Sequence, residues 1–287
     1  MKQRVITGII FIIVVAAFII PAYFMPLMAL VFALIVGSVA GNEMHKALKE
    51  GGYKPMPSMI VAGGILALGT IGLTYLLKKD FIFASAVYLF VELLLCMIAS
   101  IMPAILNKSE KPLEDGIATS FTIVYVTFPL FCLVTSVLFV ENGWFYMIPA
   151  LIAPWVSDVF AYFCGVLMGK HKIVPHISPK KTWEGSIGGA ICCALVVVLY
   201  SDLVIYKLDS IQINIVLFSI IIFVLGILIS VMSQLGDWIA SVIKRHVGIK
   251  DYGKFMPGHG GMLDRFDSAF FTLPLSLILA FVASFLH

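Results

Sequence analysis

IQINIVLFSIIIFVLGILISVMSQLGDWIA, residues 211–240, contains a single charged side chain, Asp237. A helix needs about 20 mainly apolar residues to cross the hydrocarbon core of a bilayer, and this stretch exceeds that length. We therefore predict that it crosses a membrane as a helix, with its one carboxylate near the end of the span.

The same hydrophobic character extends along the whole chain. Of 287 residues, 61% are hydrophobic and 12% are charged, whereas an average soluble domain carries about 25% charged residues. This composition predicts an all-α, polytopic integral membrane helical bundle with about nine transmembrane helices. The predicted spans are residues 5–20, 22–40, 58–77, 81–102, 117–140, 145–168, 186–206, 211–240 and 268–286. We expect one membrane domain, residues 1–287, with N-terminal spans in 1–140 and the active site carried by 141–287.

The distribution of cations predicts the orientation of these spans. With nine spans, all of the 19 Lys and Arg residues except Lys78, Lys79 and Lys207 fall on one side. Lys and Arg accumulate on the cytoplasmic side of a membrane. We therefore predict a multi-pass protein of the cell (plasma) membrane, with a cytoplasmic N-terminus and the polar loop 241–267 in the cytoplasm.

That polar loop, SVIKRHVGIKDYGKFMPGHGGMLDRFD, directly follows the stretch quoted first. Connections of this length in a compact protein are usually functional or disordered. Asp237, Ser241 and Lys244 are spaced i, i+4 and i+7, which places them on one face of a helix. The run PGHGG then ends the helix, and its glycines let backbone N–H groups approach an anion closely.

Two further carboxylates, Asp264 and Asp267, close the loop. On a starting helix their i, i+3 spacing puts both on one side, an arrangement that suits Mg²⁺. The plainer interpretation is a solvated, ion-paired helix end, but Asp237 inside an apolar span argues against it for the cluster as a whole. Metal-binding carboxylates among Lys and Arg suit phosphoryl or nucleotidyl transfer. The sequence has no Walker-type loop and no G-x-G-x-x-G, which disfavours a P-loop ATPase and a Rossmann enzyme.

These residues carry a family resemblance. The string S-x-x-K-R-x-x-x-x-K-D, then P-G-H-G-G, then D-R-x-D, within Ser241–Asp267, resembles the signature of phosphatidate cytidylyltransferases, also called CDP-diacylglycerol synthases. The segment SPKKTWEG, Ser178–Gly185, is similar to a second motif of this family, as is Ser157-Asp158 with Ala161-Tyr162 upstream of it. The resemblance covers roughly residues 150–270, and the first half of the chain matches only as a bundle of spans.

The resemblance implies a reaction in which CTP and phosphatidic acid give CDP-diacylglycerol and pyrophosphate, with Mg²⁺ as cofactor; a second cation is compatible with it. We expect the metal ligands to be Asp237, Asp264 and Asp267, with the first two preferred because motif and helical facing agree on them. Ser241 is expected to bind a phosphate or complete the metal shell. Lys244 is expected to take part in catalysis beside the phosphates.

The remaining candidates are expected to bind substrate. Cationic side chains would neutralise the triphosphate and the lipid phosphate: Lys180, Lys181, Arg245, Lys250 and Arg265. Thr182 and Glu184 are expected as supporting polar contacts. Asp158 is a candidate because it is ionisable and lies within an apolar span. His259 has two interpretations, a hydrogen-bond donor to phosphate or a residue that pins the glycine turn.

Other interpretations of the same residues remain open. The lysines of SPKKTWEG also satisfy the orientation rule alone. Glu43, at the cytoplasmic end of the second span, is interpreted as interface polarity, with the wall of the site as the alternative. A secondary transporter that uses Asp158 and Asp237 is one rival. A CDP-alcohol phosphotransferase is another, although the D-G-x-x-A-R pattern of that family is missing.

The expected partners are CTP, phosphatidic acid and membrane lipid, and no nucleic acid. The small residues of Gly185–Gly189, GSIGG, permit close approach of two helices. Because small residues of this kind mediate helix association in membranes, a homodimer is compatible with the sequence.

Overall fold

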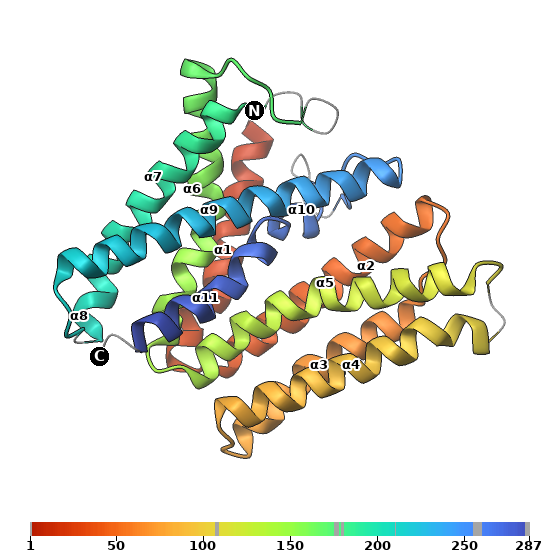
Figure 1. The fold of residues 1–287 in the computed structure, drawn as a ribbon. Helices are drawn as coiled ribbons and strands as arrows, with labels where there is room; N and C mark the ends of the chain where they lie inside the picture. The colour runs from red at the N-terminus through yellow and green to blue at the C-terminus, as the bar shows by residue number, and fades with distance from the viewer. Residues whose placement is uncertain are drawn as a thin grey trace. The chain divides into compact units, whose positions relative to one another are not determined.

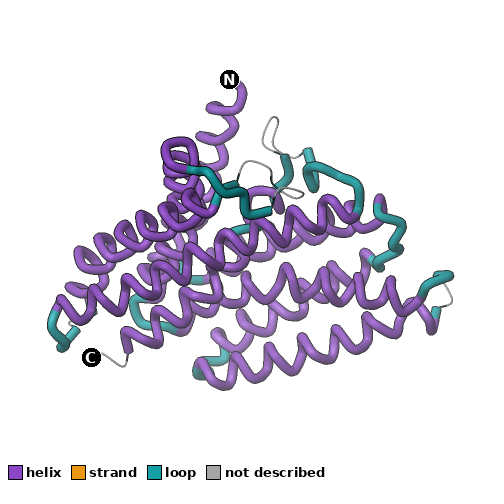
Figure 2. Tube along the Cα trace, turned by 45° about the horizontal axis from the view of Figure 1, so that its top comes forward, coloured by secondary structure: helices purple, strands orange, loops and turns teal. Residues whose placement is uncertain are grey.

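The computed structural model describes residues 2–106, 109–174, 178, 181–209, 211–254 and 260–284. Within these residues every extended regular element is a helix (Figure 1), and Figure 2 shows these helices joined by loops. Eight of the described helices are long and apolar enough to cross a membrane. The prediction of an all-α, polytopic membrane bundle is therefore confirmed.

The chain folds as two compact units. Unit 1 comprises Met1–Val140 and Ile243–Phe266, and unit 2 comprises Glu141–Val242 and Asp267–His287. The helices of unit 1 are α1 (Lys2–Phe24), α2 (Leu27–Glu50), α3 (Pro57–Leu76), α4 (Phe81–Ile105), α5 (Pro112–Phe139) and α10 (Leu263–Phe266). Those of unit 2 are α6 (Gly143–Met168), α7 (Trp183–Tyr200), η1 (Ser201–Ile205), α8 (Tyr206–Leu208), α9 (Ile215–His246) up to Val242, and α11 (Ala269–Ser284).

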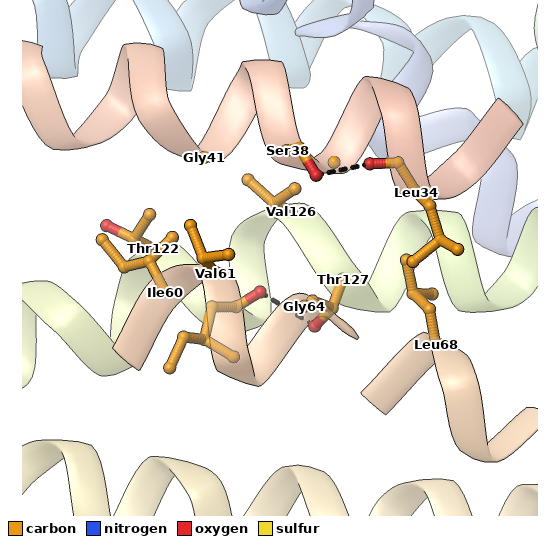
Figure 3. A pocket seen from close by; sticks show the side chains of 12 residues that line it. Leu34, Ser38, Gly41, Ile60, Val61, Gly64, Leu68, Thr122, Val126 and Thr127 are labelled. Carbon is orange, nitrogen blue, oxygen red and sulfur yellow. Dashed lines mark hydrogen bonds between the residues drawn. The ribbon is translucent and has the colours of Figure 1, made fainter. Parts of the chain in front are cut away.

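Helix α5 packs against α2, α3 and α4 in unit 1. A cavity of about 20 Å³ lies between α2, α3 and α5 (Figure 3). Of its polar lining residues, Ser38 and Thr122 donate their hydroxyl groups to backbone carbonyls one turn earlier. Ligand sites usually enclose about 300–1,000 Å³, and this space suits about one water molecule. It is a gap in helix packing rather than a substrate site.

Glycines bring α6 and α7 together in unit 2. A Cβ added to Gly185 would lie 2.6 Å from the carbonyl oxygen of Ala161, and one added to Gly189 would lie 2.8 Å from the Ala161 Cβ. Gly188 faces Cys164 of the same helix α6. The small residues of this stretch thus serve helix packing inside one chain, and they lend no support of their own to a homodimer.

The bounds of several spans differ from those expected, and the spans at the two ends of the chain show the reasons. Pro21 lies inside α1, whereas the sequence suggested a break there; transmembrane helices tolerate Pro because neighbouring groups satisfy the freed carbonyl. The break falls at Met25-Pro26 instead. At the other end, the last predicted span forms α11, which has 16 described residues and is shorter than the other spans. The predicted count of nine is therefore approximate.

Candidate functional site

The first charged cluster lies in unit 2, where the carboxylate of Asp237 on α9 accepts a hydrogen bond from the ammonium of Lys181. The two side chains are 29% and 27% exposed. Lys181 Nζ also lies 5.7 Å from the centroid of the Trp238 ring, a cation–π distance. This pair joins two of the sequence motifs, because its members are 56 residues apart in the chain.

A cavity of about 490 Å³ opens beside this pair. It is within the usual range for ligand sites. Asp158 from α6, Lys181 and Asp237 all contribute to its lining, together with Thr182 at the start of α7. The structure therefore brings four predicted site residues to one cavity that carries two carboxylates and an ammonium.

Gln234 and Ser186 line the cavity and belong to a network of polar side chains. Gln234, one turn before Asp237 on α9, accepts a hydrogen bond from the Ser186 hydroxyl and donates to the Ser186 carbonyl at 3.2 Å and to Ser230 Oγ at 3.4 Å. The hydroxyl of Ser230 contacts that of Ser157 at 2.6 Å. This network links α6, α7 and α9. The only indication of this network in the sequence is the presence of polar residues inside otherwise apolar spans.

Thr182 and Glu184 shape the segment that carries Lys181. The Thr182 hydroxyl caps α7 by accepting the Gly185 N–H at 3.2 Å. Glu184 accepts hydrogen bonds from the backbone N–H of Lys170 at 3.1 Å and of His171 at 3.2 Å, and it contacts His171 Nδ1 at 2.6 Å. Its carboxylate thus fastens the loop before α7. Lys180 lies outside the described residues.

The second charged cluster lies in unit 1 around Asp264 on α10. Asp264 Oδ1 accepts a hydrogen bond from Lys244 Nζ at 2.8 Å, and Oδ2 accepts the N–H groups of Tyr252 at 2.8 Å and Gly261 at 2.9 Å. The side chains of Lys244 and Asp264 are 12% and 4% exposed. Hydrogen bonds that involve an ionised group are roughly twice as strong as neutral ones, so this carboxylate is held firmly.

Glu43 of α2 holds the chain immediately before Asp264. Its two carboxylate oxygens accept the N–H groups of Met262 at 3.0 Å and Leu263 at 2.8 Å. These N–H groups lie at the start of α10, where a helix has no carbonyl partners of its own. Glu43 is buried, 6% exposed. The alternative interpretation of Glu43, the wall of the site, matches this position better than interface polarity does.

A glycine is required at position 260. Gly260 has a φ of +83°, in the left-handed region, and a Cβ placed there would lie 2.8 Å from Asp264 Oδ2. Only glycine adopts this conformation at little cost and leaves room for the carboxylate. The rest of the PGHGG run up to His259 lies outside the described residues, and so both interpretations of His259 stay open.

The other predicted residues of the loop differ in their exposure. Arg245 is exposed and donates to the Ile249 carbonyl at 3.2 Å. Lys250 is exposed, and Ser241 is half-buried on α9. Arg265 on α10 has a buried Nε for which the described part of the chain provides no hydrogen-bond partner.

Asp267 differs from the expectation that it shares one starting helix with Asp264. Helix α10 ends at Phe266, and Asp267 lies in the turn before α11. Its Oδ1 accepts the N–H of Ser268 at 2.7 Å. Turn residues of this kind commonly hydrogen-bond the backbone that follows them. The i, i+3 argument therefore does not apply to this pair.

The carboxylates of unit 2 can be compared with the needs of Mg²⁺. Among the residues that the structure describes, no three His, Cys, Asp or Glu side chains gather as a metal cluster. Mg²⁺ is commonly bound through one or two carboxylates, with water and substrate phosphates as the other ligands. Asp158 and Asp237 line one cavity and provide that donor set. An ion shared by Asp237 and Asp264, which belong to different units, stays a prediction.

The sequence from residue 2 to residue 283 matches the model of the cytidylyltransferase family. The phosphatidate cytidylyltransferase of Staphylococcus saprophyticus is 39% identical over 175 residues, which cover 61% of this chain and 63% of that protein. The Staphylococcus haemolyticus protein of the same name is 41% identical over 177 residues, with the same two shares. That of Staphylococcus epidermidis is 45% identical over 139 residues, 48% of this chain and 50% of that protein. The chain thus spans less than two thirds of the length of these relatives.

Proposed function

This chain belongs to the cytidylyltransferase family, and we propose that it transfers CMP from CTP to phosphatidic acid, giving CDP-diacylglycerol and pyrophosphate in phospholipid biosynthesis. The observation that carries the proposal is the Lys181–Asp237 pair beside a cavity of about 490 Å³. A substrate with several phosphates needs cations, and a metal ion needs carboxylates. The names of the relatives quoted above indicate the same substrates.

The proposed reaction is a displacement at phosphorus. An oxygen of the lipid phosphate attacks the α-phosphorus of CTP and forms a new P–O bond, while the bond between the α-phosphorus and the bridging oxygen breaks and pyrophosphate leaves. A phosphate monoester already carries about −1.5 to −2 charges at neutral pH. The nucleophile therefore needs no strong general base, and catalysis depends mainly on positioning and charge neutralisation.

The unit 2 cluster is proposed to bind the triphosphate. Lys181, together with Lys180, would neutralise its charge, and Thr182 would add a polar contact at the start of α7. Asp237 would hold Mg²⁺. Asp158 of α6, which lines the same cavity, is available as a further ligand. When bound, Mg²⁺ supplies charge neutralisation and in-line orientation of phosphate oxygens. A second cation is compatible with this donor set.

The unit 1 cluster, carried by the signature loop, is proposed to act on the substrate phosphates as well. Lys244 and the neighbouring cations Arg245, Lys250 and Arg265 would attract the two anionic substrates. Ser241 on α9 would hydrogen-bond a phosphate or complete the metal shell. Asp264 is the second proposed metal ligand, and Asp267 is a third candidate.

Charge distribution supports a proposed orientation. Lys181 and the signature loop belong to the segments that carry nearly all Lys and Arg in the predicted topology, and those segments are cytoplasmic by the positive-inside rule. CTP is a cytoplasmic nucleotide, so it would reach the cavity from there. We place the protein in the cell membrane, with phosphatidic acid entering from the lipid phase; a homodimer remains a proposal.

One assay tests this proposal against the two rivals. Detergent-solubilised protein should release pyrophosphate from CTP only when phosphatidic acid and Mg²⁺ are both present. A transporter needs a sealed compartment and would release none. A CDP-alcohol phosphotransferase would instead consume CDP-diacylglycerol when given an alcohol acceptor, and such consumption in the absence of pyrophosphate release would contradict the proposal.

A further inference from the structure

We propose that Glu43 is a positioning residue of the active site: its carboxylate fixes the backbone of Gly261–Leu263 so that Asp264 is held ready for its role. This inference rests on the proposed function, because it assigns Asp264 to the reaction. Glu43 belongs to α2, 219 and 220 residues before the backbone groups that it binds.

Three successive N–H groups are divided between two carboxylates. Gly261 donates to Asp264 Oδ2 at 2.9 Å, and the next two residues, Met262 and Leu263, donate to Glu43 at 3.0 and 2.8 Å. Gly261 directly precedes these two residues. The orientation of the Met262 and Leu263 peptide groups therefore also constrains the direction of the Gly261 N–H. Loss of the Glu43 carboxylate would release two of these three groups and leave the third without a fixed direction.

The chain also packs closely over the Glu43 side chain. A Cβ added to Gly261 would lie 2.5 Å from each carboxylate oxygen of Glu43, and one added to Gly253 would lie closer still to Oε1. Two separate parts of the loop thus approach this carboxylate at positions where any side chain would collide with it. Glycine permits this close approach of the backbone. Close backbone contact of this kind is typical of a side chain that anchors a loop.

The hydrogen bonds of Glu43 distinguish its role from that of a metal ligand. Both of its oxygens accept N–H groups, and the side chain is 6% exposed. A buried carboxylate is costly unless donors compensate its charge, and here the loop backbone provides them. Glu43 therefore acts through Asp264 and does not contact substrate.

Glu92 provides a matched control in the same unit. It is a buried helix carboxyl group, 7% exposed, and it accepts a hydrogen bond from Thr127 Oγ1 at 2.5 Å. It makes no recorded contact with the signature loop in the described residues. Glu92→Gln therefore changes a buried glutamate within the spans without touching the backbone around Asp264.

The first measurement is hydrogen exchange of the full-length protein in detergent, which needs no activity. In Glu43→Gln the side chain keeps its size but has a single acceptor oxygen, and in Glu43→Ala it has none. The N–H groups of Met262 and Leu263 should exchange about tenfold faster or more in both variants, because an unsatisfied buried donor favours local opening. Glu92→Gln should exchange there like the parent.

The second measurement is the rate of CMP transfer per folded protein, as a function of Mg²⁺. Glu43→Gln should lower kcat about tenfold or more, since small misplacements of a reacting group have large effects on rate, and should raise the Mg²⁺ concentration needed for half-maximal rate. The KM for CTP should change less than kcat does. Glu92→Gln should keep the parental kcat and Mg²⁺ requirement.

Two results would overturn the inference. Unchanged exchange of Met262 and Leu263 in both Glu43 variants would show that Glu43 does not hold the segment. Faster exchange of these N–H groups in Glu43→Gln, together with the parental kcat and Mg²⁺ requirement, would show that Glu43 anchors the segment but does not influence Asp264. If Glu43→Ala does not fold, the exchange and rate measurements on Glu43→Gln alone test the inference. Failure of the proposed function would be recognised separately, because the parent itself would then transfer no CMP.

Discussion

Lys244 and Asp264 form a buried ion pair, with 2.8 Å between Nζ and Oδ1, and they are 20 residues apart in the signature loop. The cluster of unit 2 has the same chemistry, because Lys181 pairs with Asp237. In each case a lysine ammonium pairs with a carboxylate that the proposed reaction needs. The lysines are thereby held where incoming phosphates can bind them.

Lys244→Met should destabilise the protein and slow the reaction. Breaking one side of a buried ion pair costs about 3–5 kcal/mol when the partner charge is left uncompensated. The Tyr252 and Gly261 N–H groups still compensate Asp264, so we expect the loss to lie near the lower end of that range. The thermal midpoint of the purified protein and its turnover both measure this effect. Lys254→Met, at an exposed position of the same loop to which no role is assigned, is the control and should change neither appreciably.

Asp264→Asn should abolish turnover while the protein remains folded in the membrane. The amide keeps the shape of the side chain and one acceptor oxygen, but it loses the negative charge that Lys244 and a divalent cation require. Turnover and the yield of monodisperse protein are the two readouts. Asp251→Asn, exposed in the same loop, should retain activity. An active Asp264→Asn variant would remove this residue from the proposed metal ligands.

Lys181→Ala should raise the apparent requirement for CTP. Its ammonium lines the cavity of about 490 Å³ and pairs with Asp237, so its removal takes a cation from the proposed triphosphate site. The KM for CTP should rise, and the response to phosphatidic acid should change less. Lys170→Ala, an exposed residue of the same loop, is the comparison. Equal CTP dependence in the two variants would leave Lys181 with a topological role alone.

Gly260→Ala should impair activity more than Gly248→Ala. Both glycines have a positive φ, +83° and +80°, so each substitution costs about 1–2 kcal/mol of backbone strain. Only the Cβ at position 260 would press on Asp264, whereas the space around Gly248 is open. Turnover per folded protein separates the effect of a collision with Asp264 from the effect of backbone strain. Equal losses in the two variants would contradict the proposed role of Gly260.

The membrane architecture follows from sequence because it depends on hydropathy summed over about 20 residues. Long apolar runs such as residues 211–240 predict spans whatever their neighbours are. Span ends were less predictable: Pro21 lies within α1, since other groups in a bundle satisfy a carbonyl that Pro leaves free. Such compensation depends on tertiary packing and leaves no local pattern.

The candidate site was predictable only in part for a related reason. Asp237, Asp264 and Lys181 belong to local motifs, and their residue types indicate their chemistry. Glu43 holds the backbone before Asp264 from α2, and Gln234 joins α9 to Ser186 of α7, through contacts over 219 and 48 residues respectively. A single polar residue in an apolar span gives a weak signal, because it is equally compatible with interface polarity or helix packing.

Double labelling of CTP tests the central claim most directly. Purified protein is given phosphatidic acid and CTP labelled with ³²P at either the α- or the γ-phosphate, with and without Mg²⁺. The account predicts that α-label enters the chloroform-soluble fraction only with Mg²⁺, while γ-label stays in water as pyrophosphate. Absence of α-label from the lipid, or its entry at the same rate without divalent cations, would contradict the account.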